Sequence, residues 1–514
     1  MAMYLGLLDM TLSNSWIKCS LAAVATVMMG FTSPVQAEKT LRVAVHALPP
    51  FLGHAFATTA RPTIFTTGAI YDGLVKFDRD GQLSPWLAVA WENIDNMTWR
   101  FTLRDGVSFS NGTPLTSASI ETAVQWLTSD ASMRDGVRGD IPFLKEVRVI
   151  DRLTAEIVTN IPVPNLPNYM GAMIMVDPER FAALGRQGYA DDPVGTGPFI
   201  VDDWGATTVT MDAYAESWRA PQVDRLEIVA LPSISGRVQA LLSGRVDIAT
   251  ALGPDERLSV EAAGFVLEEW LDASVAAVSF ITVHGGPLAD VRVRQALNYA
   301  VNKEGIITSL FGDLTAPATQ GVSHQAYGYN PDLKPYSYDP EKARSLLAEA
   351  GYEDGFTFEF LTQTGLGAGD LVFQLVASDL ARVGVTMEIR QLPAAAFLQT
   401  VLRDPDHGGA GAHALIWPAW PTFDAMRPML MHSCKRSTPW HCDEAIQPKI
   451  EDALVEWDPD RALALRYEIM AYTRDTAPAI FLYESPEFAA TSPGVKGYRQ
   501  DHGHINYHEI QLTD

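Results

Sequence analysis

Residues 279–307, SFITVHGGPLADVRVRQALNYAVNKEGII, predict a strand followed by a helix, at a point where one lobe of the chain ends and another begins. The strand is rich in β-forming residues and stops at Gly285-Gly286-Pro287. Asp290 is placed to cap the helix. We expect Arg292 and Arg294 on its solvated side, while residues at spacings of three and four form its buried face. Those residues are Val291, Leu297, Ala300 and Val301.

The same stretch follows the pattern P-x-x-D-x-R-V-R-x-A-x-x-x-A-[VI]-[DN]. The matching residues are Pro287, Asp290, Arg292, Val293, Arg294, Ala296, Ala300, Val301 and Asn302. In this it resembles the extracytoplasmic solute-binding proteins, family 5, which feed ABC importers of peptides and nickel chelates.

Further segments resemble the same family. They are YDGLV at residues 71–75, TWRFTLRDGVSFSNGTPLT at 98–116, VGTGPF at 194–199, GRVDI at 244–248 and DPEKARSLLAEAGY at 339–352. The resemblance covers nearly all of residues 40–507. It implies an α/β fold of the periplasmic binding protein type II kind, with two large lobes and a small inserted lobe, hinged by two crossing strands.

The resemblance also implies where the lobes lie. After a signal peptide at residues 1–37, lobe I comprises residues 38–77, 192–278 and 485–514, lobe II residues 78–191, and lobe III residues 279–484.

Local patterns support an α/β organisation. Asp339 is placed to cap a helix whose first turn holds Pro340, and Gly351 supplies its left-handed exit. Strand, helix and strand follow one another over residues 226–248 and again over residues 356–390, which predicts two parallel β-α-β units.

Charge narrows the range of partners. The 514 residues include 38 basic and 62 acidic side chains, for a net charge of −24. Such a field repels nucleic acids and anionic membrane surfaces, so we expect neither as a partner.

The first 37 residues predict an export signal. Lys18 precedes an apolar run that begins at Cys19, and Val35-Gln36-Ala37 supplies small residues for cleavage. Met10 is an alternative start to Met1. Cys19 lies at the wrong end of the run for lipid attachment, so we expect a periplasmic protein rather than a lipid-anchored one.

The two remaining cysteines, Cys434 and Cys442, predict a disulfide, since an even pair in an exported protein is usually oxidised. Metal binding is the alternative, with His432 and His441 beside the cysteines, but the spacing matches no compact zinc motif.

The loop ALIWPAWPTFDAMRPMLM, residues 414–431, supplies the first candidates for ligand binding. The resemblance places it on lobe III facing the cleft, where aromatic rings offer contact area and charged groups fix a ligand's ends. The candidates are Trp417, Trp420, Asp424 and Arg427. The alternative interpretation is core tryptophans and a surface ion pair.

Histidines supply a second set of candidates. His46 and His54 follow the first strand, and the resemblance brings this segment and the C-terminal one near the cleft. If the ligand is a nickel or other transition-metal chelate, His54, His502 and His504 are the expected metal ligands, because neutral imidazole suits these metals.

The resemblance implies a binding protein that needs no cofactor. It would capture a small peptide, peptide-like solute or metal chelate and, as a monomer, deliver it to an ABC importer permease and its ATPase. The sequence lacks a G-x-S-x-G elbow, an H-E-x-x-H pair and a phosphate-binding loop. An exported hydrolase is therefore the less favoured alternative.

Overall fold

A computed structural model describes residues 38–59, 61–364 and 368–513. The predicted signal peptide, residues 1–37, lies outside the described residues. No described helix is both long enough and apolar enough to cross a bilayer.

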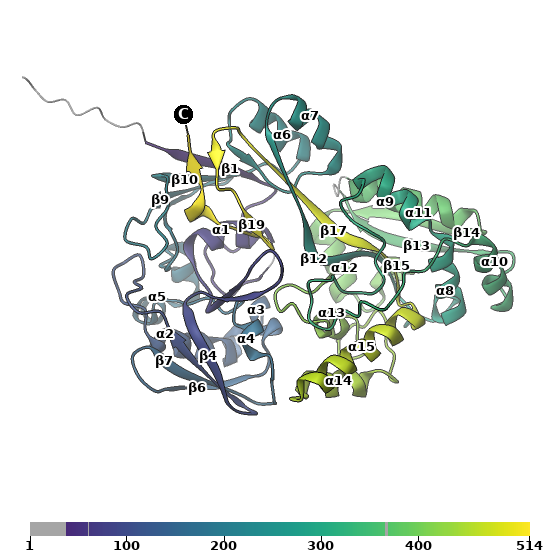
Figure 1. The fold of residues 1–514 in the computed structure, drawn as a ribbon, viewed down its shortest axis with the longest axis horizontal. Helices are drawn as coiled ribbons and strands as arrows, with labels where there is room; N and C mark the ends of the chain where they lie inside the picture. Colours follow the sequence, from purple (N-terminus) through teal and green to yellow (C-terminus); the bar gives the residue numbers. More distant parts are fainter. Residues whose placement is uncertain (1–37, 60, 365–367, 514) are drawn as a thin grey trace, which may run out of the picture. The chain divides into compact units, whose positions relative to one another are not determined.

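An 11-stranded sheet is the main element of residues 39–514, in the order β14-β13-β15-β12-β17-β11-β1-β10-β9-β8, with β16 paired to β12 (Figure 1). Its strands are β1 (Thr40–Val45), β8 (Phe199–Trp204), β9 (Thr208–Ala213), β10 (Arg225–Ala230), β11 (Ile248–Ala249), β12 (Val266–Phe280), β13 (Phe356–Gln363), β14 (Val385–Leu392), β15 (Ala412–His413), β16 (Trp417–Pro418) and β17 (Ala479–Thr491).

The two halves of this sheet are joined by β12 and β17, which pair antiparallel along almost their whole length (Figure 1). The register shifts between Leu271 and Val275 and again between Ala276 and Ala277. An irregular ladder bends and twists more easily than a regular one. These shifts lie before Ser279, where the sequence placed the end of lobe I.

Helix α8 (Val291–Ala300) begins as predicted, since the Asp290 carboxylate accepts a hydrogen bond from the backbone N–H of Arg292 at 2.8 Å. Its predicted faces were partly wrong. Val291 is exposed, whereas Arg294 is only 5% exposed. The Arg294 guanidinium donates to the carbonyls of Thr476, Ala477, Leu288 and Ala289, and these backbone acceptors make its burial tolerable.

Both predicted parallel units are confirmed. Strands β13 and β14 are connected by α11 (Ala368–Ala381) and pair in parallel. Strands β10 and β11 are connected by α6 (Ile234–Leu242), and each pairs in parallel with β1, which lies between them. Helix α10 (Pro340–Glu349) has the Asp339 cap, and Gly351 adopts the left-handed conformation.

A separate four-stranded antiparallel sheet has the order β4-β5-β7-β6 and packs against α2. Its elements are β4 (Ala88–Asp95), β5 (Thr98–Leu103), α2 (Ser117–Thr128), β6 (Leu144–Val149) and β7 (Thr154–Thr159). The helices that follow α2 in this part of the chain are α3 (Gly136–Asp140), α4 (Leu166–Tyr169) and α5 (Pro178–Asp191).

The remaining elements connect or cover the two larger sheets. The helices are α1 (Arg61–Ile70), α7 (Arg257–Ala262), α9 (Lys303–Phe311), α12 (Ala394–Arg403), α13 (Met426–Met431), α14 (Gln447–Val455) and α15 (Pro459–Thr476). The short strands are β2 (Val75–Phe77), β3 (Leu83–Pro85), β18 (Val495–Lys496), β19 (Gln500–Asp501), β20 (His504–Ile505) and β21 (Gln511–Leu512).

The hydrophobic core is continuous across the predicted lobe boundaries. One cluster of buried side chains joins Val43 to Phe101 of the small sheet, and a second joins Ala44 to Phe360. Residues 39–514 form one unit of contacts. The three lobes and their boundaries therefore stay a prediction.

The predicted disulfide between Cys434 and Cys442 is confirmed. Replacing both cysteines by alanine should lower the free energy of unfolding by about 2 to 3 kcal/mol, because the open loop regains conformational entropy in the unfolded chain. Urea unfolding, with and without a reductant, measures this. Reductant should destabilise the natural protein and leave the double variant unchanged, and a reductant effect on the variant would contradict the interpretation.

Candidate ligand-binding site

A small, partly open cavity lies where α1, β2, β20 and the loop after β16 meet. Its volume is about 40 Å³, enough for a few water molecules. The lining residues are Gly68, Tyr71, Asp72, Gly73, Val75, Lys76, Phe77, Trp86, Gly171, Arg219, Trp420, His504, Ile505 and Asn506. Each of the three predicted lobes contributes to this wall.

Trp420 forms the wall from predicted lobe III. It precedes Pro421 through a cis peptide bond, and its ring lies edge-on to His504 with centroids 5.3 Å apart. The neighbouring Phe423 stacks on Phe77 at 4.3 Å. These ring contacts bring the loop of residues 419–423 against β2 and the C-terminal segment.

A tight hairpin positions the opposite wall. Strands β19 and β20 pair Asp501 with His504. The two residues between them, His502 and Gly503, both have positive φ, as a two-residue turn with the twist of a hairpin requires. The turn directs His504 toward the cavity and leaves the Nε2 of His502 at 3.0 Å from the Asp78 carbonyl.

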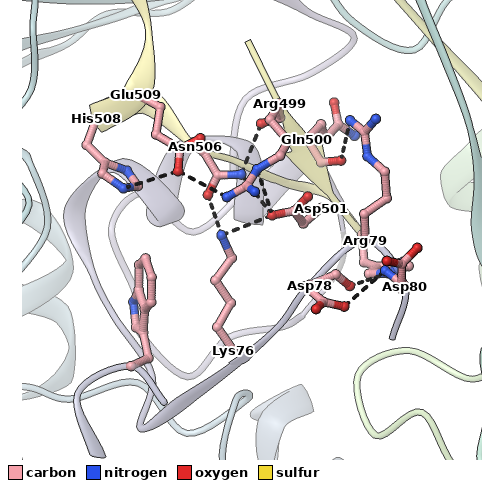
Figure 2. Close-up of polar contacts among 12 residues, drawn as sticks. Lys76, Asp78, Arg79, Asp80, Arg499, Gln500, Asp501, Asn506, His508 and Glu509 are labelled. Carbon is pink, nitrogen blue, oxygen red and sulfur yellow. Dashed lines mark hydrogen bonds and ion pairs between the residues drawn. The ribbon is translucent and has the colours of Figure 1, made fainter. Parts of the chain in front are cut away.

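Lys76 points from β2 into a polar network beside the cavity (Figure 2). Its ammonium lies 3.2 Å from the Asp501 carboxylate and also donates to the Asn506 amide oxygen. Burial lowers the pKa of Lys76, which Asp501 partly offsets. Burial raises the pKa of Asp501, but Lys76, Asn506 and Arg499 outweigh that effect and hold it below its usual value.

Asp72 is fully committed to the protein. It accepts hydrogen bonds from Trp86 Nε1 at 2.7 Å, Thr196 Oγ1 at 2.8 Å and Trp218 Nε1 at 3.2 Å. It also pairs with Arg219 at 2.8 Å. Burial raises the pKa of Asp72, but Arg219 and the three donors bring it below its usual value, so the carboxylate stays ionised.

Two predicted ligand-binding residues lie in the interior instead of at the cavity. Trp417 is 1% exposed, donates to Ser279 Oγ at 2.8 Å and stacks on His432 with centroids 3.6 Å apart. Asp424 is 0% exposed and accepts hydrogen bonds from Arg466 Nε at 3.0 Å and Nη2 at 2.7 Å. Each is held by the protein itself, and we leave both out of the proposed site.

Asp424 and its neighbours also connect two predicted lobes. Asn165 Nδ2, at the start of α4, donates to Asp424 Oδ2 at 2.6 Å, and Asn168 Nδ2 donates to the Thr422 carbonyl at 3.1 Å. Arg427, the fourth candidate of this loop, lies 3.4 Å from Asp140. These contacts fasten the Trp420 loop to residues 78–191.

The expected metal ligands are not brought together. His54 is buried with both ring nitrogens in use: Nδ1 accepts from the Phe56 N–H at 3.4 Å, and Nε2 lies 3.1 Å from the Asp135 carboxylate and 2.6 Å from Arg186 Nε. Burial lowers the pKa of His54. His46 packs on Phe65 instead. Within the described ranges, no three His, Cys, Asp or Glu side chains could together hold a metal ion.

Among the predicted candidates, Trp420 and His504 do meet at the cavity. Sequence reasoning missed Lys76, Arg219, Trp86 and Asn506. One signal for Lys76 was available, because in Val75-Lys76-Phe77 the lysine alternates with two apolar residues and so takes the opposite face of the strand.

A mixed sheet whose halves are joined by two paired strands, with a cavity walled by segments from both halves of the chain, is an arrangement that suits a solute-binding protein. The chain belongs to the bacterial extracellular solute-binding proteins, family 5, whose model matches residues 82–437. The predicted family and fold class are thereby confirmed.

Curated relatives carry the name glutathione-binding protein GsiB. The one from Pectobacterium atrosepticum is 28% identical over 405 residues, which cover 75% of this chain and 74% of that protein. The one from Salmonella typhimurium is 27% identical, covering 63% of this chain and 64% of its own length. The chain thus spans just under two thirds of the latter.

Solved structures share the fold. The periplasmic binding protein DppA from Helicobacter pylori, in complex with the peptide STSA, superposes with a TM-score of 0.79 at 21% identity, covering 92% of this chain and 98% of DppA. NikA from Brucella suis, in complex with Fe(III)-EDTA, gives 0.80 at 20% identity, covering 93% of this chain and 100% of NikA.

Proposed function

We propose that this protein captures a small peptide or peptide-like solute in the cavity between Trp420, Lys76 and His504 and delivers it unaltered to the permease of an ABC importer. One observation supports the proposal: the cavity wall is shared between the loop of residues 419–423, which holds Trp420, and two segments from the predicted lobe I, which hold Lys76 and His504. A solute held there touches both sides and so favours their closure.

The relatives support the solute class. Proteins named for glutathione binding match this chain over much of its length, and a protein of the same fold is solved with a bound peptide. Glutathione is itself a short peptide, which makes it the first probe to use.

Capture requires movement. Pockets for small-molecule ligands usually measure about 300 to 1000 Å³, far above the about 40 Å³ of this cavity. The solute would enter when the hydrogen bonds from Asn165 to Asp424 and from Asn168 to Thr422 break, and these bonds would form again once the solute is bound. Binding then shifts the population toward the closed form by rotation at β12 and β17.

The family is extracellular by its description. For this chain we propose export to the periplasm with cleavage after residue 37, action as a monomer, and docking on an importer permease that is driven by an ATPase. The relatives are binding proteins, and we propose no enzymatic activity and no nucleic-acid partner.

A nickel or other transition-metal chelate remains the alternative solute, since NikA shares the fold. His504 would be the cavity residue able to contact such a chelate, because it faces the cavity and because burial, with Lys76 and Arg219 nearby, lowers its pKa to about 3 and keeps it neutral.

Thermal shift and calorimetry on the mature protein, after removal of any co-purified solute, test these proposals. The probes are glutathione, a mixture of short peptides, and nickel–histidine. At 100 times its Kd, a true ligand stabilises the protein by about 2.7 kcal/mol. A shift with nickel–histidine alone would favour the alternative. Mass spectrometry should recover the bound probe intact, and recovery of cleaved probe would instead support a hydrolase.

A further inference from the structure

The hydrogen-bonding capacity of the cavity is unevenly distributed. Asp72 is the one carboxylate among the described residues of its wall, and four donors already occupy it. Asp501, behind Lys76, receives Lys76, Asn506 and Arg499. The Oδ1 of Asp501 has no hydrogen-bond partner among the described residues, but this side chain is 1% exposed and does not line the cavity, so neither carboxylate is presented to a ligand's ammonium group.

The buried polar atoms at the cavity that lack a hydrogen-bond partner among the described residues are donors. Arg219 is 8% exposed, and its Nε has no hydrogen-bond partner within the part of the chain that the structure describes, although its terminal nitrogen binds Asp72 and two carbonyls. Trp420 Nε1 is likewise buried and has no partner among those residues. Both residues line the cavity.

Lys76 adds a cation with remaining capacity. An ammonium has three N–H donors, and the contacts to Asn506 and Asp501 use two of them. Its side chain is 15% exposed, while that of Asp501 is 1% exposed. Lys76 lines the cavity and Asp501 does not, so a ligand there would meet the ammonium of this pair and not the carboxylate.

We propose that the cavity binds its solute by a carboxylate, held by Lys76 with Arg219 Nε and Trp420 Nε1, and that it grips no ligand ammonium through a carboxylate of its own. This inference rests on the proposed function and deepens it. Charge-assisted hydrogen bonds in a water-poor site favour an anionic end strongly over its neutral amide.

The ligand side of the proposal is tested with four forms of one peptide. These are trialanine, N-acetyl-trialanine, trialanine amide and N-acetyl-trialanine amide, with glutathione as an independent acid and inorganic phosphate to ask whether any anion suffices. Acetylation should leave the Kd within about threefold, whereas amidation should weaken binding about 10- to 100-fold, the loss of a hydrogen bond to a charged group.

The protein side uses Lys76→Met, which should weaken binding of the acid forms about 10- to 100-fold and leave binding of the amide forms unchanged. Lys76→Arg should restore much of the preference for acids. Trp420→Phe, which keeps an aromatic ring but removes its N–H, should cost about 2- to 10-fold. Lys496→Met is the matched control, since Lys496 is an exposed lysine on β18, and it should bind like the natural protein.

The outcomes separate the two proposals. Equal binding of acid and amide forms overturns the carboxylate proposal and leaves peptide capture standing. Loss of binding on acetylation alone also overturns it, because an ammonium would then be the recognised group. Binding of no peptide form and no glutathione overturns both. If phosphate competes as strongly as the peptide acids, the carboxylate proposal is overturned and the site is instead one that accepts any small anion. If Lys76→Met fails to fold, the comparison of acid and amide on the natural protein still decides.

Discussion

Replacing Asp424 by alanine is expected to lower the free energy of unfolding by about 3 to 5 kcal/mol, because the Arg466 guanidinium would remain buried without its counter-ion. Arg466 is itself deeply buried, and it also donates to the carbonyls of Ala453 and Ala462. Asn165 loses its acceptor as well, so closure and solute affinity should weaken together. Urea unfolding followed by circular dichroism measures the stability change.

The double variant Asp424→Leu with Arg466→Met is the control for this prediction. Removing both charges leaves no buried ion, so it should recover much of the lost stability. Asn165→Ala isolates the contact with α4 and should affect affinity more than stability. An Asp424→Ala protein with natural stability and weakened binding would mean that the sequence-based assignment of Asp424 to the ligand was right.

Replacing Trp417 by alanine is expected to cost about 3 to 5 kcal/mol of stability, since it opens a large cavity in a closely packed interior. The ring stacks on His432 and lies edge-on to Phe481. Gly321 approaches so closely that a Cβ there would lie 2.5 Å from the ring. Thermal and urea unfolding measure the loss.

Trp420→Ala is the matched comparison, because Trp420 is only partly buried and lines the cavity. It should lose less stability than Trp417→Ala and more affinity for the peptide probes. The reverse ranking, with Trp417→Ala folding normally and binding weakly, would contradict the core role that the packing gives Trp417.

Local features of the chain could be predicted because neighbouring residues decide them. Asp290 and Asp339 cap their helices, since a carboxylate next to the first turn reaches an unpaired N–H whatever the rest of the chain does. The disulfide was predictable from two cysteines in a chain whose sequence predicts export. Motif order then indicated the family, and with it the kind of fold.

The roles of individual polar residues could not be predicted in the same way, because they depend on partners far away in the chain. The sequence pattern assigns Arg294 to the surface, yet the side chain is buried, because the carbonyls of residues 288, 289, 476 and 477 accept its hydrogen bonds there. From the sequence, Asp424 is a suitable group to bind a ligand, but in the structure Arg466 already donates to its carboxylate. Trp417 and Trp420 are three positions apart, and the fold buries one and turns the other toward the cavity.

The sequence by itself determined the class of protein, the α/β organisation and the loop in which Trp420 lies, since these follow from short-range patterns and motif order. Only the tertiary structure decided which charges are already paired and which donors stay uncommitted. The physical reason is that a buried charge pairs with the groups that the fold places within about 3 to 4 Å of it. Lys76 and Asn506 are 430 positions apart in the sequence, and they form a hydrogen bond only because the fold brings their two segments together.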